Sequence, residues 1–122
     1  MKDENFVTMG GRITHAPGIY SVNGHGWLLS FAIAVHSLHS KKPLFMEIKV
    51  PGATDRTKLD DFAQRLPIGR KVTVHNAELQ MKQWEDSATK TTRESYHLFC
   101  RLDQIYLHEL AAGRQPDADP TT

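Results

Sequence analysis

Hydrophobic and polar residues alternate along three stretches in the first half of the chain, with the period of two that is typical of β-strands. The stretches are residues 5–14, 27–37 and 44–50, and the turn sequence before the second stretch contains Asn23-Gly24, a hairpin signal. Three strands are therefore expected. Residues on the apolar faces of the second and third strands, predicted to form the core, are Trp27, Leu29, Phe31, Ile33, Val35, Leu44, Met46, Ile48 and Val50.

The hydrophobic period changes to that of an α-helix after the third strand. Thr54 or Thr57 would cap the start of this helix, and Pro67 with Gly69 would end it. One short helix is predicted. Its apolar positions at helical spacing are Leu59, Phe62, Ala63 and Leu66.

Two further strand-like stretches follow, residues 70–84 and 96–102. The apolar positions in the two halves of the first stretch are out of register, which predicts a one-residue bulge near His75 and Asn76. Residues 85–95 are polar and are expected to form a hairpin loop, and the residues after the second stretch are expected to finish the same strand after a kink. The side chains predicted to face inward are Ala77, Leu79, Met81, Tyr96, Leu98, Cys100 and Leu102.

The order of elements is three strands, a helix and two strands. With glycines and a bulge for curvature, this order predicts an all-β fold with one short helix, the five-stranded oligonucleotide-binding (OB-fold) Greek-key barrel. The barrel domain is expected to cover residues 1–110. Residues 111–122 are small, polar and proline-containing, which predicts a short flexible C-terminal tail.

The composition is that of one soluble globular domain of 122 residues, with 39% hydrophobic and 24% charged residues. No apolar run approaches the ~18 residues of a membrane helix. The acidic residues in the opening "MKDENFVTMGG" are unlike a signal peptide, so a cytoplasmic protein is predicted. The one cysteine, Cys100, excludes an internal disulfide and is interpreted as a buried small hydrophobe.

Two aromatic residues fall on the polar faces of their strands. Trp84 is beside Lys82, and Phe45 is near Lys49. An outward aromatic ring flanked by cations suits single-stranded nucleic acid, because bases stack on the ring while phosphates meet the charges. The alternative is that each ring covers a surface edge or packs against another subunit. For a third outward aromatic, Phe99, an oligomer contact is favoured.

Basic residues at predicted strand ends and in loops could follow a phosphate backbone. Each one alone is more simply a solvated surface charge, but together they form a basic stripe that the formal net charge of +1 does not reveal. They are Arg12, Lys41, Lys42, Lys90 and Arg93.

Neither a metal site nor an active site is predicted. Of the seven histidines, only His36 and His39 are close in sequence, and no cysteine or carboxylate falls at a matching ligand spacing. No glycine-rich phosphate loop, nucleophile motif or recognisable carboxylate constellation is present. We expect no cofactor and no enzymatic activity.

The stretch "GRKVTVHNAELQMKQWEDSATKTTRESYHLFCRLDQIYL" resembles the bacterial-type single-stranded DNA-binding proteins. "NFVTMGGRIT", "PLFMEIKVPG" and "KLDDFAQRL" are similar to the family's opening strand, third strand and helix, so the resemblance covers nearly all of residues 5–107. The chain departs from the family at His39 and Pro51, which stand near positions where the family carries stacking aromatics. His39 is still counted among the candidate DNA contacts.

The resemblance implies a homo-oligomer, a tetramer or else a dimer, that binds single-stranded DNA without strong sequence preference. It would protect the strand in replication, recombination or repair, including that of a plasmid or phage. The alternative is a primosomal-type accessory or protein-interaction module with weak DNA binding, which the missing aromatics favour. Family members recruit partners through an acidic tip with a terminal apolar residue. Here Asp117 and Asp119 lack that apolar anchor, so no recruitment through the tail is expected.

Overall fold

The structure, a computed structural model, describes residues 2–22, 26–52 and 56–109. The predicted tail, its boundary at residue 110 and the Asn23-Gly24 turn lie outside the described residues. In chain order the elements are β1 (Val7–Ile13), β2 (Gly18–Val22), β3 (Gly26–Val35), β4 (Leu44–Gly52), α1 (Arg56–Ala63), β5 (Lys71–Asp86), β6 (Thr91–Phe99), the 3-10 turn η1 (Leu102–Gln104) and β7 (Ile105–Leu107).

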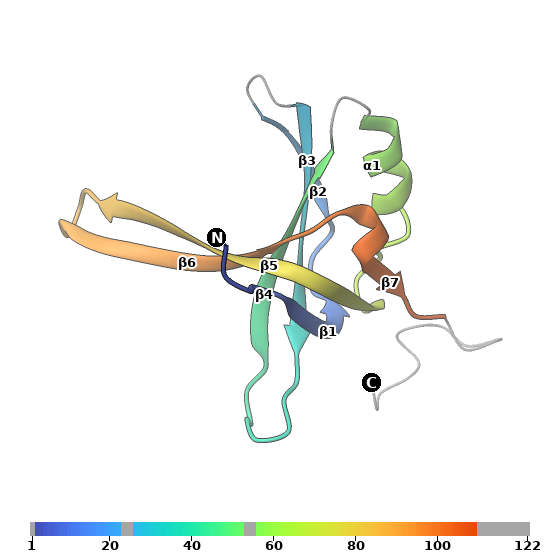
Figure 1. Ribbon diagram of the computed structural model, residues 1–122, viewed down its shortest axis with the longest axis horizontal. Helices are drawn as coiled ribbons and strands as arrows, with labels where there is room; N and C mark the ends of the chain where they lie inside the picture. Colours follow the sequence, from blue (N-terminus) through green and yellow to red (C-terminus); the bar gives the residue numbers. More distant parts are fainter. Residues whose placement is uncertain (1, 23–25, 53–55, 110–122) are drawn as a thin grey trace.

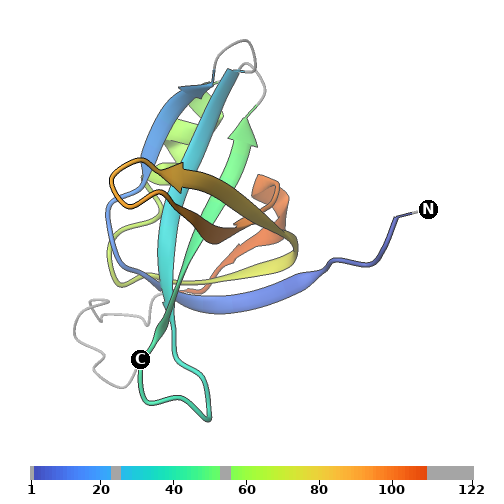
Figure 2. The same ribbon diagram turned by 90° about the vertical axis from the view of Figure 1, so that its left-hand side faces the viewer.

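The strands form one sheet that closes into a barrel (Figure 1, Figure 2). Their order is β1-β3-β4-β6-β5-β7, and β1 also pairs with β5, which closes the ring. β4 and β6 run parallel, whereas the neighbours of β3 and β5 within this ring are antiparallel. α1 packs against β2, β3 and β4. This arrangement confirms the predicted OB-fold, with β2 added as a short strand paired to β3.

The barrel encloses one hydrophobic core, and most predicted inward residues lie in it. Leu44, however, is 47% exposed, because it pairs with Val35 at the rim where β3 and β4 end. Trp27 is half-buried at the other end of β3, and the Arg56 guanidinium lies 4.7 Å from the centre of its ring. Half-buried against the core are Val35, Phe62, Ala63 and Leu102. The predicted core residues confirmed as buried are Leu29, Phe31, Ile33, Met46, Ile48, Val50, Leu59, Leu66, Ala77, Leu98 and Cys100.

The predicted bulge in the fourth long strand, β5, is confirmed at Asn76. Pairing between β1 and β5 shifts there, since Met9 is opposite Val74 but Val7 is opposite Ala77. Asn76 has a φ of 53°, a left-handed conformation that asparagine tolerates better than most residues. The bulge therefore keeps Val72 and Val74 before it and Ala77 after it facing the core while the strand bends around the barrel.

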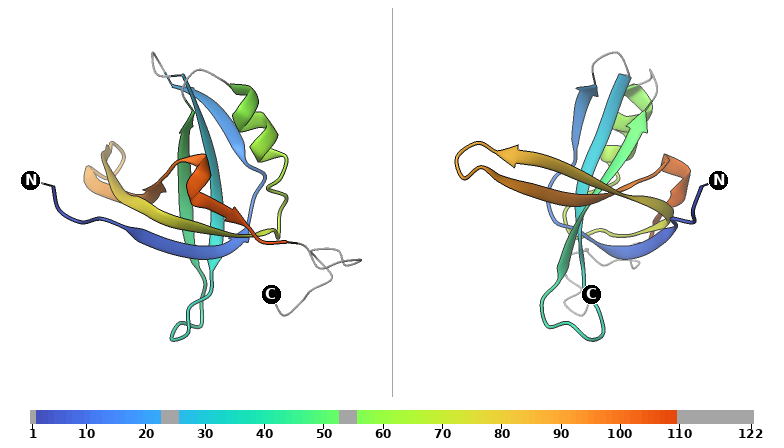
Figure 3. Two further views of the ribbon diagram at one scale, coloured as in Figure 1. Left: turned by 45° about the vertical axis from the view of Figure 1, so that its right-hand side comes forward. Right: turned by 60° about the vertical axis from the view of Figure 1, so that its left-hand side comes forward.

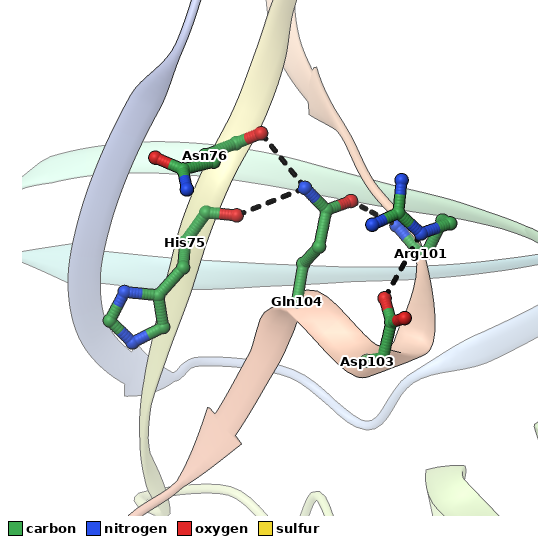
Figure 4. Close-up of polar contacts among 5 residues, drawn as sticks. All are labelled: His75, Asn76, Arg101, Asp103 and Gln104. Atoms are coloured by element: carbon green, nitrogen blue, oxygen red, sulfur yellow. Dashed lines mark hydrogen bonds and ion pairs between the residues drawn. The ribbon is translucent and has the colours of Figure 1, made fainter.

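A glutamine holds the C-terminal segment against this bulge (Figure 4). The side-chain amide of Gln104 donates to the backbone oxygens of His75 at 3.2 Å and Asn76 at 2.9 Å. Its oxygen accepts from the backbone N–H of Arg101 at 2.7 Å. These bonds turn the chain through η1, so β7 pairs with β5 instead of continuing β6. The prediction that the residues after β6 finish the same strand is therefore wrong.

The second half of β5 and the first half of β6 leave the barrel as a long two-stranded hairpin, here called the arm (residues 81–96; Figure 1, Figure 3). The predicted loop over residues 85–95 is wrong, because pairing continues from Met81 opposite Tyr96 to Asp86 opposite Thr91. β4 pairs with β6 at residues 97–99, and within the described residues no third strand pairs with the arm. Met81 and Tyr96, predicted to face inward, are consequently 48% and 49% exposed, and Leu79 at the base of the arm is 37% exposed.

The ends of the helix differ slightly from the sequence prediction. α1 begins at Arg56, so Thr57 lies within the helix and not at its cap, and Thr54 lies outside the described residues. The helix ends at Ala63, before Pro67. Gly69 has a φ of 92°, which suits glycine and supports the predicted stop. In the described part of the chain, no helix has the length and hydrophobicity needed to cross a membrane.

Gly11 is a position where closure of the barrel demands the smallest residue. A Cβ at Gly11 would lie 2.4 Å from the backbone oxygen of Ala34 on the neighbouring strand. Gly11→Ala should therefore lower the free energy of unfolding by roughly 1–3 kcal/mol, as overpacking does. Chemical denaturation would measure the loss. Gly10→Ala is the matched control, because the nearest atom to its Cβ would be the side-chain hydroxyl of Thr73 at 3.0 Å, with backbone no closer than the Val72 oxygen at 3.5 Å. An equal loss in both variants would contradict this explanation.

Candidate nucleic-acid interface

The outward side chains of β3, β4, β6 and β5 form one continuous surface, here called the outer face. The registers place Ala34 opposite Phe45, and Lys49 opposite both Ser30 and Phe99. Because partners in a ladder point to the same side of a sheet, these side chains share the outer face. Its members are Ser30, Ala32 and Ala34 on β3, Phe45, Glu47 and Lys49 on β4, His97, Phe99, Ser95 and Arg93 on β6, and Gln80, Lys82 and Trp84 on β5.

Both candidate stacking residues lie on the outer face and are exposed. Phe45 is 64% exposed near the start of β4, and Trp84 is 44% exposed on the arm. Between them lie Lys49 on β4, His97 on β6 and Lys82 on β5, whereas β3, with the small side chains of Ala32 and Ala34, borders Phe45 on the side away from the arm. Small side chains leave the sheet surface shallow, so a planar base can approach it closely. The two rings therefore stand at separated points of one surface.

The charges near these rings differ in how they are paired. Lys49 lies 3.8 Å from Glu47, which also accepts from the Ser30 hydroxyl at 3.3 Å. Arg93, opposite Trp84, forms a 2.8 Å ion pair with Asp86. Lys82 is exposed and has no ion pair within the described residues. Of these cations, Lys82 is thus the freest to meet a phosphate.

The remaining predicted basic contacts fall at three separate places. His39, Lys41 and Lys42 are exposed in the segment between β3 and β4, which extends from one end of the barrel (Figure 1). Lys90 is exposed at the tip of the arm. Arg12 lies on β1 opposite Ala34, and its guanidinium donates to the Gly69 oxygen at 2.9 Å. The structure therefore does not bring these cations into one stripe. They flank the outer face on different sides.

A buried histidine beneath the outer face was missed by the sequence analysis. His97 is 8% exposed, and its ring bonds the Gln80 side-chain oxygen at 3.2 Å. Burial, and then the positive charges of Lys49 and Lys82, lower the pKa of His97, while Glu47 acts in the opposite direction. The clue in the sequence was the histidine's outward position in a strand, but nothing in the pattern showed that its neighbours would cover it.

Phe99 is half-buried at the edge of the outer face, its ring centre 6.2 Å from that of His97. With Phe6 and Pro51 it lines a shallow recess of about 270 Å³. Phe6 is 71% exposed. Polar residues, among them Asn5 and Glu78, line the rest of the recess, and the predicted oligomer contact would lie here beside the N-terminal segment.

The candidate metal ligands and the one cysteine lie apart from one another in the part of the chain that the structure describes. Within residues 2–22, 26–52 and 56–109, no cluster of three or more histidine, cysteine or carboxylate side chains could hold a metal ion. Cys100 is buried, and burial raises the pKa of its thiol to about 12. A thiol with so high a pKa is a poor nucleophile, which agrees with its predicted role as a core residue.

The chain was compared with known proteins by sequence and by structure. Neither the protein-family models nor the curated proteins gave a sequence match. A solved structure of the Plasmodium falciparum SSB in complex with ssDNA is similar, with a TM-score of 0.69 and 19% identity, covering 90% of this chain and 97% of that one. The yeast (S. cerevisiae) mitochondrial single-stranded DNA-binding protein Rim1 is also similar, with a TM-score of 0.67 and 16% identity, covering 87% and 96%. The chain shares the fold of these single-stranded DNA-binding proteins.

The environment of His97 predicts how stability depends on pH. Because the folded protein lowers the pKa of this base, the unfolded chain binds more protons, and the contribution of His97 to stability is lost as pH falls through about 6.5. Denaturant titrations between about pH 7.5 and 5.5 should therefore show a fall in the free energy of unfolding that is smaller in His97→Gln. His36→Gln, at an exposed position, is the control. If the free energy of unfolding of His97→Gln depended on pH as steeply as that of the wild type, His97 would not be the cause of the pH dependence.

Proposed function

We propose that this protein binds single-stranded DNA without strong sequence preference and catalyses no reaction. The observation that carries the proposal is the pair of exposed aromatic rings, Phe45 and Trp84, on one continuous sheet face with Lys49 and Lys82. Stacking on an aromatic ring tolerates any base, because every base has a π-face. The similarity to single-stranded DNA-binding proteins supports the proposal through the fold.

In this mechanism, one base stacks on Trp84 and another on Phe45. The phosphates between them approach Lys82 and Lys49, which lie on the same face, and the shallow surface over Ala32 and Ala34 can accommodate a further base on the other side of Phe45. Binding neutralises phosphates, so affinity falls with salt by a log–log slope of about −0.7 per phosphate. The biological role that follows is protection of exposed strands in replication, recombination or repair in the cytoplasm, including those of a plasmid or phage.

A second candidate function is that of a primosomal-type accessory or protein-interaction module. The observation that favours it is the side of the arm opposite Trp84, where Met81 and Tyr96 are about half exposed beside Leu79 at the base. Acidic residues, Glu85 and Glu94, accompany these apolar side chains, so this side of the arm repels phosphates and suits a protein partner. Weak binding of an oligothymidine would favour this module over the first proposal.

Trp84→Ala should weaken binding of an unstructured oligothymidine by roughly 1–3 kcal/mol, because it removes one stacking platform. Phe45→Ala should show a smaller loss of the same kind. Fluorescence anisotropy of a labelled oligothymidine measures both. The wild-type tryptophan signal is a second readout, since Trp27, the other tryptophan, is half-buried under Arg56.

The matched control is Tyr96→Ala, which removes an aromatic of similar exposure from the opposite side of the same arm. It should leave DNA affinity unchanged. If Trp84→Ala kept the wild-type affinity for DNA, or if Tyr96→Ala lost as much affinity as Trp84→Ala, the outer face would not be the binding surface. Thermal unfolding should be nearly unaffected in both variants, because neither ring is in the core.

We also propose that the protein forms a homo-oligomer, a tetramer or else a dimer. Among the described residues, the first half of β1 pairs with β5 on one side only, because β3 pairs with β1 at Arg12 and Ile13. The free edge of β1 and the exposed Phe6 beside the recess at Phe99 offer backbone groups and apolar surface to a second copy.

Sedimentation equilibrium at micromolar concentration should give the mass of two or four chains. Phe99→Ala should shift the distribution toward smaller species, because it removes apolar area at the recess, whereas Phe45→Ala should not. A monomeric wild-type protein would contradict the proposal.

A further inference from the structure

A cluster of cations lies on the outside of the barrel beyond Phe45, away from the arm. The registers form a row across four strands, in which Phe45 is opposite Ala34, Ala34 is opposite Arg12, and Arg12 is opposite Lys71. Since paired residues point to the same side, the outer face continues from β4 over β3 and β1 to the start of β5. Three inter-strand steps of about 4.8 Å separate Phe45 from Lys71 along this row.

An aromatic residue on β7 lies next to the end of the row, two residues along the β5–β7 ladder from Lys71. Tyr106 on β7 is opposite Thr73 on β5 and is 53% exposed. Its ring meets that of His108 edge to face at 4.8 Å. His108 is held in turn by the Thr73 hydroxyl at 2.8 Å and by a bond from its backbone N–H to the Lys71 oxygen at 3.1 Å. The position of Tyr106 beside Lys71 is thus set by the β5–β7 ladder and by His108.

The charges in this region are mainly positive. Burial, and then the positive charges of Lys71, Arg12, His75 and Arg70, lower the pKa of His108. No carboxylate of the described chain counteracts them, although the exposed Glu109 is the next residue. Arg12, Arg70 and Lys71 take part in none of the ion pairs formed among the described residues. Their positive charge, which no ion pair balances, favours the binding of an anion.

We infer that the single strand bound over Phe45 continues across β1, where Arg12 and Lys71 take its phosphates and Tyr106 stacks a further base. The inference rests on the proposed function and extends it to a second subsite. An exposed aromatic beside unpaired cations is the same combination that Trp84 and Lys82 present on the arm. The row of about 14 Å corresponds to about four nucleotides at the roughly 3.4 Å spacing of one strand in a duplex, so a modestly longer strand reaches the subsite.

A second copy of the chain is a poorer occupant of this surface. In a two-fold symmetric contact the same patch meets itself, so Arg12, Arg70 and Lys71 would face their own copies. Like charges brought together in this way repel, whereas a phosphate backbone neutralises them. The charge of the patch therefore selects nucleic acid.

The experiment compares two labelled oligothymidines, of about 6 and about 16 nucleotides, which lie within the range of site sizes for one OB fold. Tyr106→Ala should weaken binding of the longer strand about fivefold or more and leave the shorter strand nearly unaffected. Lys71→Gln should also weaken the longer strand and reduce its log–log salt slope by about 0.7. Tyr106→Phe keeps the ring and should restore wild-type affinity. Lys58→Gln, an exposed cation on α1, is the matched control for lost charge.

The outcomes separate this inference from the proposed function. Wild-type affinity of Tyr106→Ala and Lys71→Gln for the longer strand would overturn the subsite, while a loss in Trp84→Ala for both lengths would still support the outer face. Equal losses for both lengths in Tyr106→Ala would also overturn it, since Tyr106 would then belong to the primary contact. If Lys71→Gln changed the mass in sedimentation and left binding unchanged, the patch would be an interface between copies. If the wild-type protein bound neither strand, both proposals would fail.

Discussion

The double pairing of β1 is the interaction on which the rest of the structure depends. Its residues pair with β5 through Val7–Arg12 and with β3 at Arg12 and Ile13, and this crossing closes the sheet into a ring. Closure gives each barrel strand one side that faces the core and one that faces outward. It succeeds because Gly11 lets the Ala34 backbone approach and because the bulge at Asn76 bends β5. The continuous outer face that carries the candidate DNA contacts is a consequence of this closure.

The β5–β6 hairpin lies in two different environments along its length. Up to Leu98 and Leu79, β5 and β6 belong to the barrel, and β4 adds a third strand at residues 97–99. Beyond that point the arm has no third strand, so its apolar alternation no longer marks a buried side. Trp84 is exposed for the same reason as Met81 and Tyr96, but only Trp84 shares its side of the arm with Lys82. Charge, and not hydrophobicity, distinguishes the two sides of the arm.

Much of this could be predicted from the sequence. The alternation at Leu29, Phe31 and Ile33, the helix around Leu59 and the bulge at Asn76 are local patterns, and all three are present. What failed depended on long-range geometry. Alternation at Met81 cannot show where a strand leaves the barrel, and the turn of the chain at η1 depends on Gln104 reaching across to His75 and Asn76. Likewise, the cluster around His108 joins Arg12, Lys71 and Tyr106, which are remote in sequence and meet only through the ladders of β5 with β1 and β7. The outward positions of Phe45 and Trp84 were predictable, because successive side chains of a single strand alternate between its two faces.

A small change in twist at the base of the two-stranded arm displaces the residues further along the arm by a larger distance. Trp84 lies four residues beyond Gln80, which is about 14 Å at the rise of a β-strand. Two-stranded ribbons vary in twist more than wider sheets do, and a change of about 10° at the base displaces a ring at that distance by roughly 2 Å. Phe45 pairs with Ala34 of β3, and the β4–β6 ladder begins two residues further on at Glu47, so this ring lies closer to the closed part of the sheet than Trp84 does. In the proposed binding mode, the span between bases stacked on Phe45 and on Trp84 therefore changes with the twist of the arm, which lets the span match purines and pyrimidines.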